Sequence, residues 1–118
     1  KDELLEAISE IKKLKEDFYK NVFVPGELFD FNEELAKAGR VADFLELGEL
    51  FAKDALEREE SCGGHFREEH QTKEGEALRD DENYNFVSAW QFKENSEPMW
   101  DKEILKFESV KLKSRSYK

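Results

Sequence analysis

Apolar residues recur every three or four positions through the first part of the chain. This spacing predicts an amphipathic α-helix from about Asp2 to Lys20, with its apolar stripe facing a core rather than a membrane or a partner. On the polar side, Glu16 and Lys20 lie four residues apart, which favours an ion pair. The Val24-Pro25-Gly26 run then ends the helix. The stripe consists of Leu4, Ile8, Ile11, Leu14, Phe18 and Val22.

A second helical pattern, between residues 35 and 56, has apolar residues on more than one face, so this helix is expected to pack on two sides. Asp30 or Asn32 is expected to cap its start, followed by glutamates that suit the positive end of the helix dipole. Gly39 is the expected site of a kink or a division, because glycine within a helix costs about 1 kcal/mol relative to alanine. Small residues would let another element approach closely; they are Gly48, Ala52 and Ala55.

Alternating residues predict two strands near the C-terminus. Aromatic residues alternate with smaller ones over residues 86–92, and a turn over 93–98 leads to a return strand over about 99–107. Trp90 and Trp100 give this hairpin an aromatic face. Because two strands alone are only marginally stable in water, the hairpin is expected to pack on the helices or on a missing partner. The tail is basic and contains Lys106, Lys111, Lys113, Arg115 and Lys118.

The predicted fold is therefore mainly α: a small helical bundle followed by a C-terminal aromatic β-hairpin arm. With 118 residues, the chain has the length of a single domain. Within it, residues 1–60 hold the helices, residues 61–85 form a joint and a loop, and residues 86–118 form the hairpin arm and tail. The first residue is lysine rather than methionine, so we expect a fragment of a longer protein.

Composition narrows the possible functions. The formal charge of -10 argues against a nucleic-acid-binding surface, which needs clustered lysine and arginine. No apolar run reaches the roughly 18 to 20 residues that span a bilayer, so we expect no direct membrane insertion. A single cysteine suits a reducing compartment, and the cytosol is the expected location.

The segment between the helices and the hairpin concentrates the candidate chemistry. Cys62, His65 and His70 have a spacing similar to that of zinc ligands, but a structural zinc site needs four ligands, so we expect no metal. Cys62 and His65 are also candidates for a nucleophilic pair, although no third group to orient the imidazole is evident. The interpretation favoured by the residues alone is a helix C-terminus at which Gly63 or Gly64 takes the left-handed conformation.

Three glutamates crowd the end of the second helix, where the helix dipole favours cations. We therefore expect one of three nearby arginines to compensate one of them, with a solvated acidic turn as the alternative. Residues 71–77 are polar and contain glycine, which predicts a mobile loop. The glutamates are Glu57, Glu59 and Glu60, and the arginines are Arg58, Arg67 and Arg79.

Two runs in this segment resemble the C-terminal signature of succinate dehydrogenase and fumarate reductase flavoprotein subunits. That signature runs E-S-R-G-x-H-x-R-x-D, then a short spacer and R-D-D-E-N-W. The corresponding runs are Glu60-Ser61-x-Gly63-Gly64-His65-x-Arg67 and Arg79-Asp80-Asp81-Glu82-Asn83. Three further stretches fit the same family: Phe31-Asn32-x-Glu34-Leu35, the helix from Ala42 to Arg58, and the closing Arg115-Ser116-Tyr117.

The chain also departs from this signature. Cys62 stands where the family usually has arginine, Glu69 stands near its usual aspartate, and Tyr84 replaces the customary tryptophan. Residues 71–77 form a small polar insertion. L-aspartate oxidase, a relative that shares much of the signature, is the nearest competing family member.

The resemblance implies a parent enzyme that interconverts succinate and fumarate and passes electrons from FAD to an iron-sulfur subunit. It also implies a cytoplasmic location, peripheral to the inner membrane through partner subunits. The chain has no G-x-G-x-x-G run, so we expect this fragment to bind no FAD and to be inactive alone. The flavin-binding and substrate-binding residues of the family lie upstream, and no catalytic residue is assigned to this chain.

The expected role is that of a scaffold which packs on the upstream flavin-binding domain of the same chain. The alternatives are a free-standing acidic helical interaction module and the matching domain of an L-aspartate oxidase-like flavoenzyme. The candidate residues of this inter-domain joint are Glu60, Ser61, Gly64, His65, Arg67, Arg79, Asp80 and Asp81.

Overall fold

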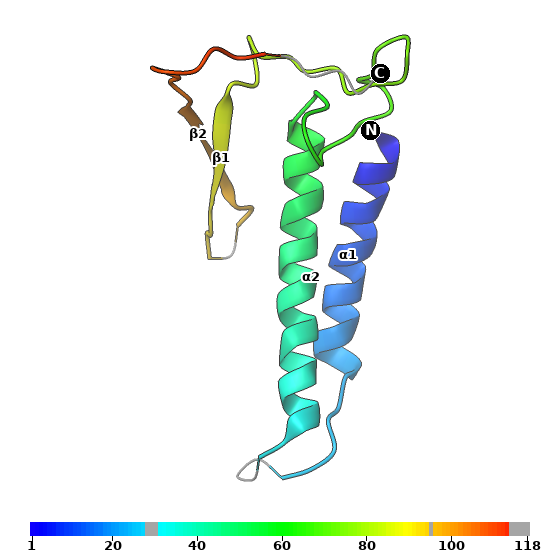
Figure 1. Ribbon diagram of the computed structural model, residues 1–118. Coiled ribbons are helices and arrows are strands. Elements are labelled where there is room, and N and C mark those ends of the chain that lie inside the picture. The colour runs from blue at the N-terminus through cyan, green and yellow to red at the C-terminus, as the bar shows by residue number, and fades with distance from the viewer. Residues whose placement is uncertain (28–30, 95, 114–118) are drawn as a thin grey trace. The chain divides into compact units, whose positions relative to one another are not determined.

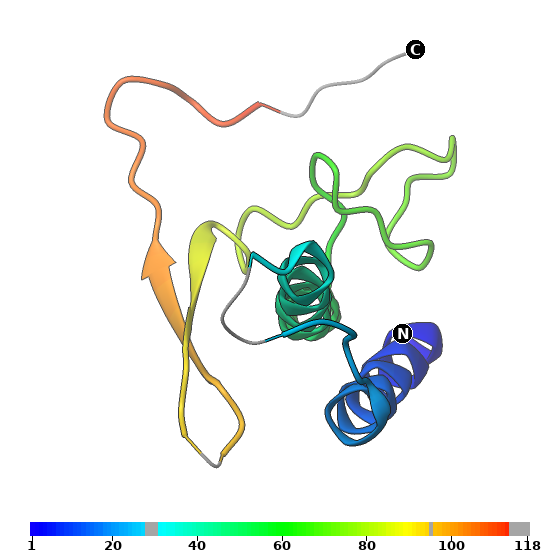
Figure 2. The same cartoon turned by 90° about the horizontal axis from the view of Figure 1, so that it is seen from below.

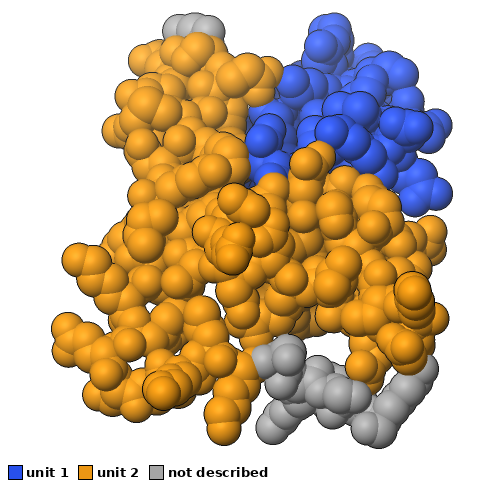
Figure 3. Space-filling model, turned by 90° about the horizontal axis from the view of Figure 1, so that it is seen from above, with its two compact units in different colours: residues 1–57 blue, residues 58–118 orange. Residues whose placement is uncertain are grey.

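The computed structural model describes residues 1–27, 31–94 and 96–113, with elements in the order α1, α2, β1 and β2 (Figure 1). Two helices followed by a two-stranded antiparallel hairpin confirm the predicted fold class. The chain divides into two compact units, residues 1–57 and residues 58–118, which Figure 3 colours separately. The single domain expected over residues 1–118 stays a prediction.

The first unit is an antiparallel helical hairpin of α1 (Asp2–Asn21) and α2 (Glu33–Glu57) (Figures 1 and 2). The backbone N–H of Leu35 donates to Asn32 Oδ1 at 3.0 Å, so Asn32 caps α2 as expected. The other candidate cap, Asp30, lies outside the described residues. Asn32 Nδ2 also donates to the Pro25 carbonyl at 2.9 Å, so one side chain both starts α2 and closes the connection between the helices.

Helix α2 runs through Gly39 without division. A Cβ built on Gly48 would lie 3.9 Å from Ile11 Cδ1, an ordinary van der Waals distance, so Gly48 faces α1 but alanine would also fit there. The contact stripe of α1 is narrower than the sequence suggested, because Leu14 and Val22 are exposed. The predicted Glu16–Lys20 ion pair is present at 3.3 Å.

A buried carboxylate, Glu49, lies in this unit with only 8% of its surface exposed. It pairs with Lys53 at 2.7 Å along α2 and with Lys15 of α1 at 2.9 Å. Burial alone would raise the pKa of the Glu49 carboxyl. The hydrogen bonds and charges of these two lysines outweigh that effect, so the pKa lies below its ordinary value and the group stays ionised. The ion pairs therefore tie the two helices together.

Helix α2 was expected to pack on two sides, but within this unit only one side is covered. Helix α1 contacts one side of α2. A second set of apolar residues on α2 is exposed; it comprises Val41, Phe44, Leu47 and Phe51.

In the second unit, β1 (Phe86–Gln91) pairs with β2 (Met99–Ile104). Trp90 lies opposite Trp100, and their rings stack with centroids 5.8 Å apart. Phe86, which is 4% exposed, is the one buried apolar residue among the described residues. Both strands end earlier than predicted, and the turn expected over residues 93–98 includes position 95, which lies outside the described residues.

Candidate functional site

The glycine pair forms a two-residue hairpin turn. Cys62 N donates to the His65 carbonyl at 2.8 Å, and His65 N donates to the Cys62 carbonyl at 3.1 Å. Gly63 has a φ of 60°, as the first central residue of such a turn requires. The expected left-handed glycine is therefore present, but its expected setting was wrong. Helix α2 ends at Glu57, well before this turn.

Ser61, which precedes this turn, is fully buried, and its side chain bonds to the backbone on the far side of the turn. Its Oγ accepts a hydrogen bond from Arg67 N at 2.7 Å and donates to the Arg67 carbonyl at 3.1 Å. The backbone N–H of Ser61 donates to the Leu78 carbonyl at 2.9 Å. One small hydroxyl thus satisfies both backbone groups of Arg67, which an alanine at this position could not do.

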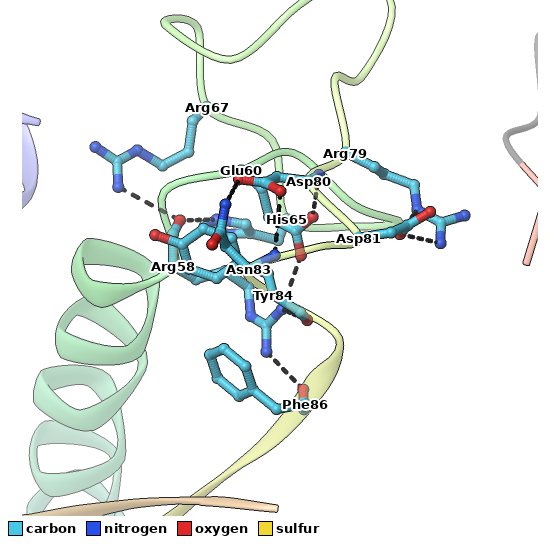
Figure 4. A network of polar contacts seen from close by, with 10 residues as sticks. All are labelled: Arg58, Glu60, His65, Arg67, Arg79, Asp80, Asp81, Asn83, Tyr84 and Phe86. Atoms are coloured by element: carbon cyan, nitrogen blue, oxygen red, sulfur yellow. Dashed lines mark hydrogen bonds and ion pairs between the residues drawn. The ribbon is translucent and has the colours of Figure 1, made fainter. Parts of the chain in front are cut away.

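Glu60 joins the two halves of the signature, and only 3% of its surface is exposed. Its Oε1 accepts from Arg58 Nη1 at 2.7 Å, while its Oε2 accepts from Asp80 N at 2.9 Å (Figure 4). The carboxylate therefore reaches a residue 20 positions further along the chain. This contact explains why an acidic residue is needed here despite its position just after a helix.

Arg58 pairs with Glu60, as one of the three arginines was predicted to do. It also contacts two backbone carbonyls that the sequence did not indicate. Its Nη1 also donates to the Tyr84 carbonyl at 3.1 Å, and its Nη2 donates to the Phe86 carbonyl at 2.9 Å. The guanidinium lies 4.7 Å from the centre of the Phe86 ring. Arg58 was absent from the predicted joint residues. The only available sequence signal was its position among three glutamates.

Arg67 is buried, with 4% of its surface exposed, and it pairs with Glu69 through its Nε at 3.1 Å and through its Nη2. The Arg67 guanidinium holds the pKa of the Glu69 carboxyl at about 2. His65 Nε2 lies 2.9 Å from the Arg58 carbonyl oxygen, to which it donates as the Nε2–H tautomer. Arg67 Nη1 reaches the same oxygen at 3.5 Å. The signature histidine and arginine therefore converge on one backbone carbonyl (Figure 4).

The second signature run forms a local cluster. Arg79 Nε donates to Asp81 Oδ1 at 3.0 Å, and Arg79 Nη1 donates to the Lys113 carbonyl at 3.1 Å. Asp80 accepts from Asn83 N at 3.2 Å and from Asn83 Nδ2 at 2.8 Å. These hydrogen bonds from Asn83 hold the pKa of the Asp80 carboxyl below its usual value.

The predicted joint residues differ in exposure: Gly64 and Asp81 are exposed, whereas His65, Arg79 and Asp80 are partly buried. Glu60, Ser61 and Arg67 are buried and bonded within the joint. The turn residues Cys62, Gly63 and Gly64 are exposed, as is Phe66, which shows half of its surface. A Cβ built on Gly64 would meet no atom within 4 Å, so the chain itself leaves room for a side chain there.

The segment expected to be a mobile loop, residues 71–77, forms a hydrogen-bonded turn, and its mobility stays a prediction. Thr72 N donates to the Glu76 carbonyl at 2.8 Å, and Gly75 N donates to the Thr72 carbonyl at 3.0 Å. Gly75 has a φ of 80°, which glycine adopts readily. Gln71 and Ala77 form a bridge that closes the turn.

Metal binding and thiol catalysis gain no support from this geometry. No group of three or more His, Cys, Asp or Glu side chains that could hold a metal gathers among residues 1–27, 31–94 and 96–113. The Nε2 of His65 is directed at a carbonyl oxygen rather than at the thiol of Cys62. In the same described ranges, neither helix is long and apolar enough to cross a membrane.

A comparison with protein families gives this arrangement its context. The family model described as "Fumarate reductase flavoprotein C-term" matches residues 1–117. The chain therefore belongs to this family, the C-terminal domain of succinate dehydrogenase and fumarate reductase flavoproteins. No curated protein and no solved structure matches the chain.

Proposed function

We propose that this chain is the scaffold domain that docks on the flavin-binding domain of its parent, an enzyme that interconverts succinate and fumarate. In this proposal, FAD is bound upstream and electrons pass to an iron-sulfur subunit at the membrane surface. Family membership supports the oxidoreductase class. The observation that carries the docking role is the division of the joint into a buried, fully bonded frame and an exposed turn.

The N–H groups that close the glycine turn do not fit a phosphate of FAD. A phosphate cradle needs backbone N–H groups that point at the ligand. At the glycine turn, the N–H groups of Cys62 and His65 instead donate to each other's carbonyls. We therefore assign this chain a positioning role in the parent.

The docking contacts are assigned to the exposed turn, Cys62 to Gly64, and to Phe66. This assignment sharpens the sequence prediction, which placed Glu60, Ser61 and Arg67 at the interface. Those three side chains shape the turn from inside, because each is at most 4% exposed. No atom of this chain would prevent a side chain at position 64. A glycine there is therefore expected to allow the close approach of a second surface.

The test introduces Gly64→Gln and Phe66→Asp into the full-length flavoprotein subunit. Gly64→Gln should leave the thermal unfolding of the 118-residue chain unchanged, because the site is open. The same substitution should lower the melting temperature of the full-length subunit and weaken flavin retention, because it blocks docking. The control is Gly39→Gln within α2, where a Cβ also meets nothing within 4 Å and a better helix former should not lower the melting temperature of either protein. A full-length Gly64→Gln subunit with normal stability would contradict docking through the turn.

The class of reaction is tested separately. Full-length subunit is assayed with succinate, fumarate and L-aspartate, and we expect turnover with the first two. Turnover with L-aspartate instead would favour the L-aspartate oxidase relative. The 118-residue chain alone should show no saturable change when FAD fluorescence is titrated. Micromolar binding by this chain would contradict a purely positioning role.

A further inference from the structure

The chain beyond β2 is tied to the joint at both ends. Residues 105–113, here called the strap, contain no helix or strand. At the first end, Leu105 N donates to the Asn85 carbonyl at 3.1 Å, and Asn85 Nδ2 donates to the Leu105 carbonyl at 3.3 Å. At the other end, the Lys113 carbonyl accepts from Arg79 Nη1 at 3.1 Å. Figure 2 shows the strap, in orange to red, leaving β2 and then bending to run across the upper part of the view.

Arg79 is built to hold the second end. Its Nε and Nη2 both donate to Asp81 Oδ1, which fixes the plane of the guanidinium. The remaining nitrogen, Nη1, then points at the Lys113 carbonyl. A planar fork can satisfy a carboxylate and a carbonyl at once, whereas a lysine ammonium is a single point of charge. The Arg79 side chain is partly covered, with 27% exposed.

Between its two anchors the strap has little burial to hold it. Phe107 is 46% exposed, Val110 is 70% exposed and Leu112 is 41% exposed. Segments with few buried apolar contacts open at low free energy. The position of the strap therefore depends on its anchors, at Asn85 and at Arg79.

We propose that Arg79, oriented by Asp81, is a latch that closes the C-terminal strap over the joint. Releasing it opens the strap from the Lys113 end while the frame of Glu60, Ser61 and Arg67 stays formed, because the hydrogen bonds described above for the frame do not involve the Arg79 side chain. This assigns the first residue of the Arg79-Asp80-Asp81 run to holding the tail rather than to docking. The proposal does not depend on the docking role.

The test is limited trypsin digestion of the full-length flavoprotein subunit, followed by mass spectrometry of the released peptides. Trypsin cleaves after Lys106 and Lys111, which lie near opposite ends of the strap. Losing a charge-assisted hydrogen bond should raise cleavage after Lys111 about tenfold or more in Arg79→Gln. Arg79→Lys should also raise it, because lysine keeps the charge but loses the fork. Asn85→Ala should instead favour cleavage after Lys106.

The control is Arg40→Gln, which removes an exposed arginine of α2 and should leave cleavage of the strap unchanged. Two outcomes would overturn the latch. The first is unchanged cleavage after Lys111 in both Arg79 variants. The second is a rise in cleavage after Lys12 and Lys53, in the helices, that is as large as the rise after Lys111. Arg79 would then support the whole fold rather than the strap.

Discussion

The two units of the chain bury a carboxylate in different ways. In residues 1–57, Glu49 is held by lysines whose flexible side chains reach it from two helices. In residues 58–113, Glu60 is held by a backbone N–H and by Arg58, which is itself fixed by two carbonyls. Two carboxylates that are buried to a similar extent can therefore contribute unequally to the stability of their units. Freed lysines can turn to water, but Arg58 cannot leave without breaking the frame.

The chain allows the two units to be followed separately. Both tryptophans, Trp90 and Trp100, lie in the hairpin of the second unit. Both helices lie in the first. Urea unfolding followed by tryptophan fluorescence therefore reports on residues 58–113, whereas circular dichroism at the helix band reports on residues 1–57.

The largest effect is expected for Glu60→Ala. This change strands the Arg58 guanidinium and leaves Asp80 N without its acceptor. We expect a loss of about 3 to 5 kcal/mol in the fluorescence-detected free energy of unfolding. The control is Glu46→Ala, which removes an exposed partner of Lys15 and should cost about 0 to 1 kcal/mol. Equal losses for the two variants would contradict the bridging role of Glu60.

A smaller effect is expected for Glu49→Ala in the helical unit. Its partners Lys15 and Lys53 have side chains that are 21% and 15% exposed, so each can be rehydrated by a modest rotation. We expect a loss of about 1 to 2 kcal/mol, between the values for exposed and buried pairs, in the circular dichroism transition. If Glu49→Ala lost as much unfolding free energy as Glu60→Ala, the proposed difference between the two carboxylates would be wrong.

Acid should weaken the joint through Glu69. Its ordinary pKa of 4.5 is lowered to about 2 by Arg67, so above pH 4.5 the group is ionised in both states and its stabilisation is complete. As the pH falls from about 4.5 towards 2, the unfolded chain takes up the proton first and the stabilisation is lost. An NMR titration of the Glu69 carboxyl should give a midpoint near 2. In Arg67→Gln the midpoint should return towards 4.5, and an unchanged midpoint would contradict this pairing.

The smallest effect concerns the hairpin. Ser88 Oγ and Trp100 Nε1 are buried without a hydrogen-bond partner among the described residues. Ser88→Ala removes one of these costs with little change in volume, so it should stabilise the second unit by up to about 1 kcal/mol. Ser9→Ala on the exposed face of α1 is the control, and it should leave the fluorescence transition in place. A destabilised Ser88→Ala chain would show that the hydroxyl has a partner.

The order of residues along the chain was sufficient to locate the helices and strands and to recognise the family. Periods of 3.6 and 2 located the helices and the strands, because side-chain burial follows backbone geometry. Asn32 could be recognised as a cap because its partner, Leu35, is only three residues away. The family was recognisable because the runs at residues 60–67 and 79–83 stay contiguous in the sequence.

The pairing of the polar groups, in contrast, could be seen only in the folded chain. Arg58 contacts carbonyls 26 and 28 residues away, and Arg79 contacts one 34 residues away. No periodicity marks such pairs, because the partners are backbone carbonyls, which every residue carries. The same reason explains the misplaced glycine turn. Gly63 showed that a left-handed residue was needed, but only the pairing of Cys62 with His65 placed it in a hairpin.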